Sequence, residues 1–76
     1  MDNWIVSSPD LLGGKPCIRD TRISVEFILE LLASGMTPVE ILESYPHVSA
    51  EGLAAALRHA AEAVKNEIVW DVKISA

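Results

Sequence analysis

The run Thr37-Pro38-Val39-Glu40 defines the start of a helix more sharply than any other part of this chain. A threonine hydroxyl at the N-cap, a proline at the first helical position and a carboxylate at the third together form a capping box with the preferred proline. Pro46 ends the same segment, because proline cannot continue a helix. This spacing predicts a short helix over 38–44, so the chain must fold around short helices joined by tight turns.

The preceding segment has the apolar period of an amphipathic helix. Ser24 is a good N-cap, and Gly35 adopts the left-handed conformation that commonly ends a helix. We therefore expect a helix over 25–34, whose buried stripe at i, i+3, i+4 and i+7 consists of Val25, Ile28, Leu29 and Leu32.

A third and longer helix is predicted after the proline. Ser49 is a suitable N-cap and Glu51 stands in the first turn, where Gly52 costs roughly 1 kcal/mol relative to alanine. The helix is expected to end at Lys65 or Asn66. Its apolar face comprises Leu53, Leu57, Ala60, Ala61 and Val64.

The two ends of the chain are expected to be extended. Residues 17–18 and 22–23 flank the tight turn Arg19-Asp20-Thr21, which favours a β-hairpin within residues 1–24. After the third helix, Trp70, Val72 and Ile74 alternate with polar residues, which indicates a strand or a docking tail over 67–76. A helix that ends later, near Trp70, is the alternative.

These elements predict a mainly α fold. A trihelical helix-turn-helix core over 25–66 follows the hairpin segment, and residues 1–66 form a single domain with 67–76 as its tail. Another three-helix packing with no DNA-binding role would have the same outline.

Length and charge limit the class of protein further. The chain has 76 residues, half of them apolar, and a net charge of −5, which excludes a disordered tail and leaves room for one domain. A core this small is marginally stable, and the lone Cys17 forms no internal disulfide, so we expect a homodimer. No apolar run approaches the ~20 residues of a membrane span, and no signal peptide is evident, so we expect a cytoplasmic protein with no membrane partner.

The run Gly13-Gly14-Lys15-Pro16-Cys17-Ile18-Arg19-Asp20-Thr21-Arg22-Ile23 resembles the signature of a prokaryotic family of short proteins catalogued as a domain of unknown function. The similarity continues through residues 31–42 and Tyr45-Pro46. Asp20 replaces a usual glycine, and Ser24 a common proline. The resemblance implies a helix-turn-helix fold and a role like that of VapB antitoxins, which accompany PIN-like ribonuclease toxins.

Four basic residues are the candidate contacts to nucleic acid or to a partner: Lys15, Arg19, Arg22 and Arg58. The first three lie within eight positions, and Arg58 lies on the third helix. A guanidinium suits either a phosphate or a structural tie to carbonyls and carboxylates. We expect Arg22 to support the fold and Arg19 to bind a partner.

No group of residues predicts catalysis. Cys17 lacks an adjacent base, and a zinc site of Cys17, His47 and His59 lacks paired ligand spacing. Gly13-Gly14-Lys15 lacks the rest of a phosphate loop. We therefore expect a non-enzymatic protein without metal or cofactor. The resemblance implies that it is an antitoxin-like protein, which would neutralise a ribonuclease toxin and could bind operator DNA as a dimer. The alternatives are a DNA-binding regulator without a toxin and a dimeric interaction module.

Overall fold

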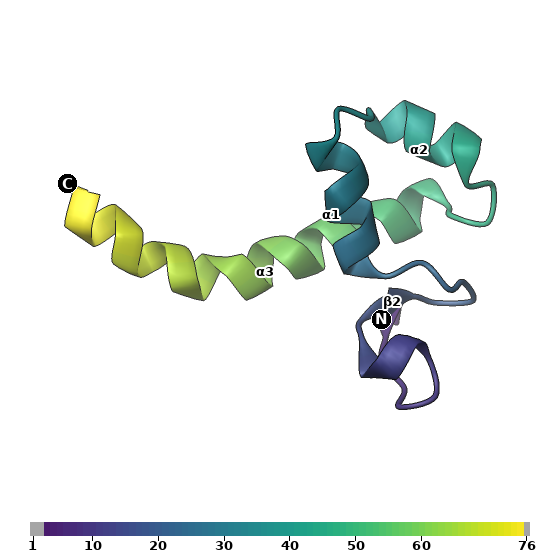
Figure 1. Cartoon of the computed structure of the whole chain (residues 1–76), viewed down its shortest axis with the longest axis horizontal. Helices are drawn as coiled ribbons and strands as arrows, with labels where there is room; N and C mark the ends of the chain where they lie inside the picture. The colour runs from purple at the N-terminus through teal and green to yellow at the C-terminus, as the bar shows by residue number, and fades with distance from the viewer. Residues whose placement is uncertain (1–2, 76) are drawn as a thin grey trace.

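The computed structural model describes the backbone of residues 3–75 and the side chains of residues 3–65. Two short strands, β1 (Ile5–Val6) and β2 (Cys17–Ile18), enclose a single 3-10 turn, η1 (Leu12–Gly14). Three helices follow: α1 (Val25–Ala33), α2 (Pro38–Ser44) and α3 (Ala50–Ser75). The strands, α1 and α2 gather around the first half of α3, and the second half of α3 projects away from them (Figure 1).

The N-terminal antiparallel pair is confirmed, but its strands differ from the expected ones. β2 pairs with β1 in a register that sets Ile5 opposite Ile18 and Val6 opposite Cys17. The segment that contains the expected partner, residues 22–23, forms no strand. An isolated bridge joins Cys17 to Ser24, flanked by hydrogen bonds of 2.9 Å from Ile18 N to Ile23 O and from Val25 N to Pro16 O. Residues 22–23 cannot extend further, because Ser24 already caps α1.

The sequence signals at both ends of α1 act as predicted. Ser24 Oγ accepts a hydrogen bond of 2.9 Å from Phe27 N. At the other end Gly35 has φ +104°, and Met36 N donates to Leu31 O at 3.1 Å, which is the Schellman pattern. The helix ends at Ala33, one residue before the predicted end.

The helix α2 has the predicted bounds. Glu40 N donates to Thr37 Oγ1 at 3.2 Å, and Thr37 N donates to Glu40 Oε1 at 2.8 Å, so both halves of the capping box form. Because the box satisfies two backbone donors locally, this helix start needs no tertiary contact.

The helix α3 is longer than predicted. Ser49 caps it as expected, accepting a hydrogen bond of 3.0 Å from Gly52 N. The backbone then remains helical to Ser75, so the prediction of an extended strand is wrong for residues 67–75, and the alternative end near Trp70 is also too early; residue 76 lies outside the described residues. The physical reason is the absence of any glycine or proline after Gly52, which leaves no local signal that ends the helix.

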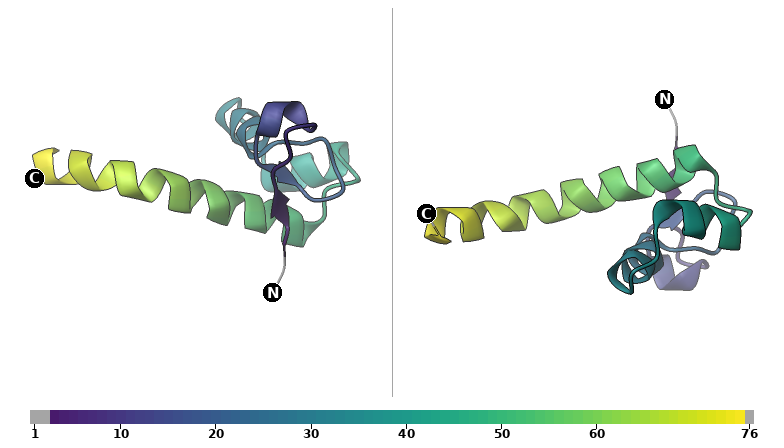
Figure 2. Two further views of the ribbon diagram at one scale, coloured as in Figure 1. Left: turned by 90° about the horizontal axis from the view of Figure 1, so that it is seen from below. Right: turned by 90° about the horizontal axis from the view of Figure 1, so that it is seen from above.

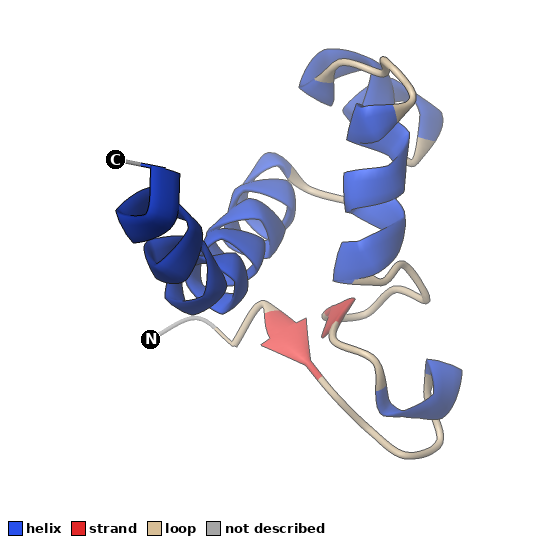
Figure 3. Ribbon diagram, turned by 60° about the vertical axis from the view of Figure 1, so that its left-hand side comes forward, coloured by secondary structure: helices blue, strands red, loops and turns tan. Residues whose placement is uncertain are grey.

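The core lies where β2 and the three helices meet (Figure 3). Ile18, Ile28 and Ile41 are its largest fully buried residues, one each from β2, α1 and α2. From α3, Leu53, Ala56 and Ala60 complete the core, whereas Ala61 and Val64 are exposed. The predicted buried face of the third helix was therefore too long, because the covering elements end near Ala60.

Candidate functional site

The structure divides the four predicted contact residues into two pairs. Lys15 and Arg22 line a hollow beside the start of α1. Arg58 lines a different hollow, between the N-terminal segment and α3, together with Trp4, the residue on which Arg19 stacks. The basic residues of the predicted turn therefore lie in two separate places: Lys15 and Arg22 beside α1, and Arg19 beside Trp4.

Arg19 is held by contacts within its own chain. Its guanidinium carbon lies 4.6 Å from the centroid of the Trp4 ring, a cation–π arrangement. Arg19 N donates to Trp4 O at 2.6 Å, and Nη1 reaches Asn3 O at 3.5 Å. Asp20 Oδ2 lies 3.8 Å from Arg19 Nε. The contacts with Trp4 and Asn3 fasten the start of β1 to the end of β2, which is the supporting role that the sequence assigned to Arg22.

Arg22 has the opposite surroundings. It is exposed, and within residues 3–65 its side chain enters no salt bridge or hydrogen bond. It lines the hollow beside α1 and a second one that also contains His47. Its guanidinium is therefore the more available of the two for an external anion.

Lys15 is already paired. Its Nζ lies 2.7 Å from Glu26 Oε1 in the first turn of α1. The hydrogen bond and the charge of Glu26 both raise the pKa of Lys15 above its ordinary value of 10.5. Both side chains are exposed, so the pair is screened and contributes little to stability. An incoming anion would have to compete with Glu26 for this ammonium.

The hollow beside α3 combines an aromatic ring with basic side chains. Trp4 and Ile5 face Ala55, Arg58 and His59 across it. Arg58 and His59 are exposed, and Glu62 offsets the positive charge of Arg58. Sequence reasoning missed Trp4, because residues 4 and 58 meet only when β1 packs on α3.

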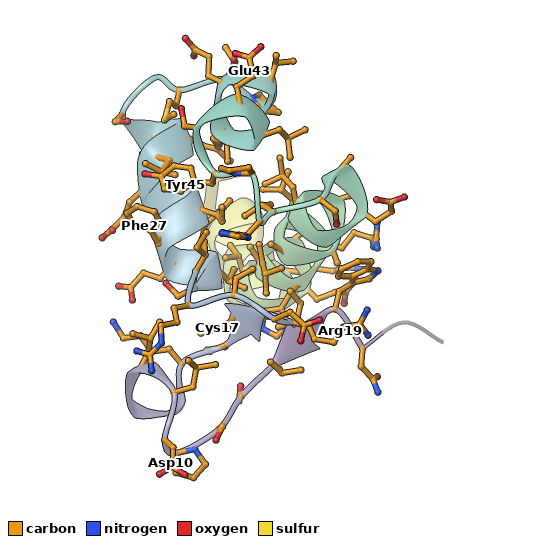
Figure 4. The ribbon with its side chains drawn as sticks, turned by 90° about the vertical axis from the view of Figure 1, so that its right-hand side faces the viewer. Asp10, Cys17, Arg19, Phe27, Glu43 and Tyr45 are labelled. Carbon is orange, nitrogen blue, oxygen red and sulfur yellow. The ribbon has the colours of Figure 1, made fainter. Side chains whose placement is uncertain are left out.

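The residues considered for chemistry stay apart. Cys17 is fully buried, and its Sγ lies 3.3 Å from Lys15 O, to which the thiol can donate. In the searched part of the chain, no three His, Cys, Asp or Glu side chains come together as metal ligands. Phe27 and Tyr45 pack edge to face, with their ring centroids 5.6 Å apart, and tie α1 to the end of α2. Figure 4 shows these two residues together and Arg19 beside the strands.

The fold and these exposed hollows define a small helical domain with an N-terminal antiparallel strand pair. The family model described as "Protein of unknown function (DUF433)" matches residues 5–60, so the chain belongs to the DUF433 family. The match covers the strands, α1, α2 and the part of α3 that they cover.

Two relatives support this assignment. The "Uncharacterized protein y4eO" of Sinorhizobium fredii (strain NBRC 101917 / NGR234) is 38% identical over 52 residues, which is 68% of this chain and 24% of that protein. The chain thus spans about a quarter of that relative's length. A crystal structure of a DUF433 member from Anabaena variabilis ATCC 29413 is 35% identical and superposes with a TM-score of 0.75, over 99% of this chain and 71% of that one.

None of the described helices combines the length and the apolar character that crossing a bilayer demands.

Proposed function

We propose that this chain is a non-catalytic binding protein whose acidic helical unit binds a basic surface of another protein. The resemblance of residues 13–23 to the VapB-like family implies the partner class, a PIN-like ribonuclease toxin. The chain would then act as its antitoxin.

The distribution of charge along the chain carries this proposal. Residues 23–57, which contain α1, α2 and the start of α3, hold five glutamates and no lysine or arginine. The chain has six basic and eleven acidic residues in total, so outside this stretch six charges of each sign balance. The whole net charge of −5 therefore belongs to the helical unit.

The five glutamates are exposed. They are Glu26 and Glu30 on α1, Glu40 and Glu43 on α2, and Glu51 in the first turn of α3. In the part of the chain with described side chains, only Glu26 of these five has a salt bridge. A ribonuclease that attracts RNA phosphates presents a basic surface, which is the electrostatic complement of such a unit.

The same distribution disfavours operator binding by the helix-turn-helix mode. In that mode the start of the last helix enters the major groove, and lysine and arginine neutralise the phosphates nearby. Here that start carries Glu51, and the first cation on α3 is Arg58, two turns later. DNA contacts would depend on the pairs at Lys15 and Arg22 or at Arg19 and Arg58.

An RNA-cleavage assay tests the proposal. We expect a ribonuclease gene beside the gene for this chain. Its product is incubated with RNA, alone and with an equimolar amount of the chain. We expect cleavage to stop when the chain is present. Unchanged cleavage, or the absence of any ribonuclease gene beside this one, would contradict the antitoxin role. A mobility-shift titration with the DNA upstream of the gene tests the regulator alternative in parallel. The homodimer expected from the sequence stays a prediction.

A further inference from the structure

An apolar groove lies where α3 leaves the body of the domain. Its volume is about 240 Å³. Leu29 and Val64 face it and are 40% and 41% exposed, which is high for large aliphatic side chains. Glu26 and His59 are its polar neighbours. The apolar lining consists of Pro16, Val25, Leu29, Ala60, Ala63 and Val64.

Beyond this groove, no described helix or strand packs against α3. Every described side chain from Ala61 to Lys65 is exposed. The ribbon of α3 continues to Ser75, away from α1, α2 and the strands (Figure 2). Residues 61–75 span about 22 Å at the rise of an α-helix. A helical segment of this length is marginal in water without packing against an apolar face. The sequence beyond Lys65 still includes five large apolar residues, Ile68, Val69, Trp70, Val72 and Ile74.

We infer that a second copy of this chain fills the groove, with residues 61–75 of each copy lying against the groove of the other. The described chain combines this groove with an uncovered helical segment, and it cannot close the groove with that segment because the segment continues the helix that forms one wall of the groove. In a two-fold symmetric dimer, the groove of each copy would be filled by the helical segment of the other. This inference rests on the proposed function in one respect: it gives the dimeric assembly in which the binding protein would act.

The expected interface is small. Stable complexes commonly bury about 800 Å² per partner, and a groove of this volume supplies a minor part of that area. One side of a helix about 22 Å long and about 10 Å wide adds on the order of 300 Å². We therefore expect a reversible dimer that dissociates on dilution.

Charge also favours this location over the rest of the helical unit. A second copy that approached α2 would meet Glu40 and Glu43 with no nearby lysine or arginine in the sequence. At the groove, Glu26 is already neutralised by Lys15 at 2.7 Å, and Lys65 lies one residue beyond Val64. Two copies of an acidic chain therefore repel each other less at the groove than at α2.

The test compares the same substitution on two sides of α3. Ala63→Glu places a carboxylate in the groove, whereas Ala61→Glu places it beside the Trp4 hollow. Sedimentation equilibrium of the whole parent chain should show reversible association toward twice the monomer mass of 8.2 kDa. Ala63→Glu should raise the dissociation constant by more than about tenfold, because an unpaired carboxylate would be buried. Ala61→Glu should leave the constant within about twofold of the parent value, because its site remains exposed.

Two results would overturn the inference: a parent chain that stays at the monomer mass at the highest micromolar concentrations, or equal weakening by the two substitutions. If circular dichroism shows that Ala63→Glu loses helix, Leu29→Gln on the α1 wall of the groove replaces it in the test. It should likewise raise the dissociation constant by more than about tenfold. The measurement contains no ribonuclease. A monomeric chain that still stops RNA cleavage would overturn the dimer alone, and a dimer that leaves cleavage unchanged would overturn the proposed function alone.

Discussion

Gly52 of α3 faces Ile18 of β2 so closely that a Cβ on the glycine would lie 3.0 Å from Ile18 Cγ2. The same added atom would lie 3.2 Å from Ser49 Oγ and 3.4 Å from Trp4 Cε3. The absence of a side chain at position 52 therefore lets the strand pair rest directly on the first turns of α3. This contact also brings Trp4, and with it Arg19, beside the helix.

We expect Gly52→Ala to destabilise the domain. Helix propensity alone would favour alanine by roughly 1 kcal/mol. Ile18 is 1% exposed and has no room to withdraw, so overpacking of about 1–3 kcal/mol outweighs this gain. Thermal denaturation should show a lower Tm than the parent, with the exposed Ala61→Gly as a reference for propensity at an unpacked helical site. A higher Tm for Gly52→Ala would show that the strand pair does not press on α3.

Asp20→Gly should stabilise the domain by about 0.5–1 kcal/mol. Asp20 has φ +65°, a left-handed conformation that is strained for residues with a Cβ and free for glycine. Its side chain is 91% exposed, so little contact is lost. Asp20→Ala is the matched control, since it removes the carboxylate but keeps the Cβ. Chemical denaturation should therefore show a higher free energy of unfolding for Asp20→Gly than for Asp20→Ala. Equal free energies would show that the Cβ at this turn causes no strain.

The ends of the short helices could be predicted from the sequence because they are set by neighbouring residues. Thr37 and Glu40 satisfy each other's backbone donors within one turn, and Gly35 ends α1 through its own φ. The partner of β2 is a different case. Val6 and Cys17 are eleven residues apart, and their pairing depends on packing against α3 rather than on the turn beside Cys17.

The surroundings of the candidate contact residues could not be predicted from the sequence. The cations Lys15, Arg19 and Arg22 are close in sequence, but each meets a different environment. Glu26 holds Lys15, Trp4 holds Arg19, and Arg22 stays exposed. These differences arise from where α1 and β1 lie in the fold, which no local pattern specifies.

Arg19→Ala should lower stability, and Arg22→Ala should not. Removing the cation–π contact with Trp4 costs about 0.5–1 kcal/mol at an exposed site, whereas the exposed Arg22 makes no such contact, so its loss stays within about 0.5 kcal/mol. Urea denaturation of the two variants measures the difference. A loss of stability confined to Arg22→Ala would contradict the contacts assigned here and restore the roles expected from the sequence.

The raised pKa of Lys15 in the Lys15–Glu26 pair predicts a change in stability at high pH. Because Glu26 raises the folded-state pKa of Lys15 above 10.5, the stabilisation is fully present below that pH and is lost as the pH rises through the folded value. An NMR titration of the Lys15 side chain should give a pKa above 10.5 in the parent, and Glu26→Gln should lower it toward 10.5. The same pKa in both proteins would show that the ion pair does not form in solution.

The acidic helical unit is proposed to bind a basic partner protein. Calorimetric titration of the ribonuclease expected beside its gene, with the parent and charge-reversed chains, tests this binding most directly. Glu43→Lys reverses an exposed charge in the last turn of α2, where a cation suits the helix dipole and the fold is kept. Glu62→Lys makes the same change on α3, outside residues 23–57. We expect Glu43→Lys to weaken binding to the ribonuclease by about tenfold or more, and Glu62→Lys to bind like the parent. Equal affinities for all three chains, or no binding by the parent, would contradict it.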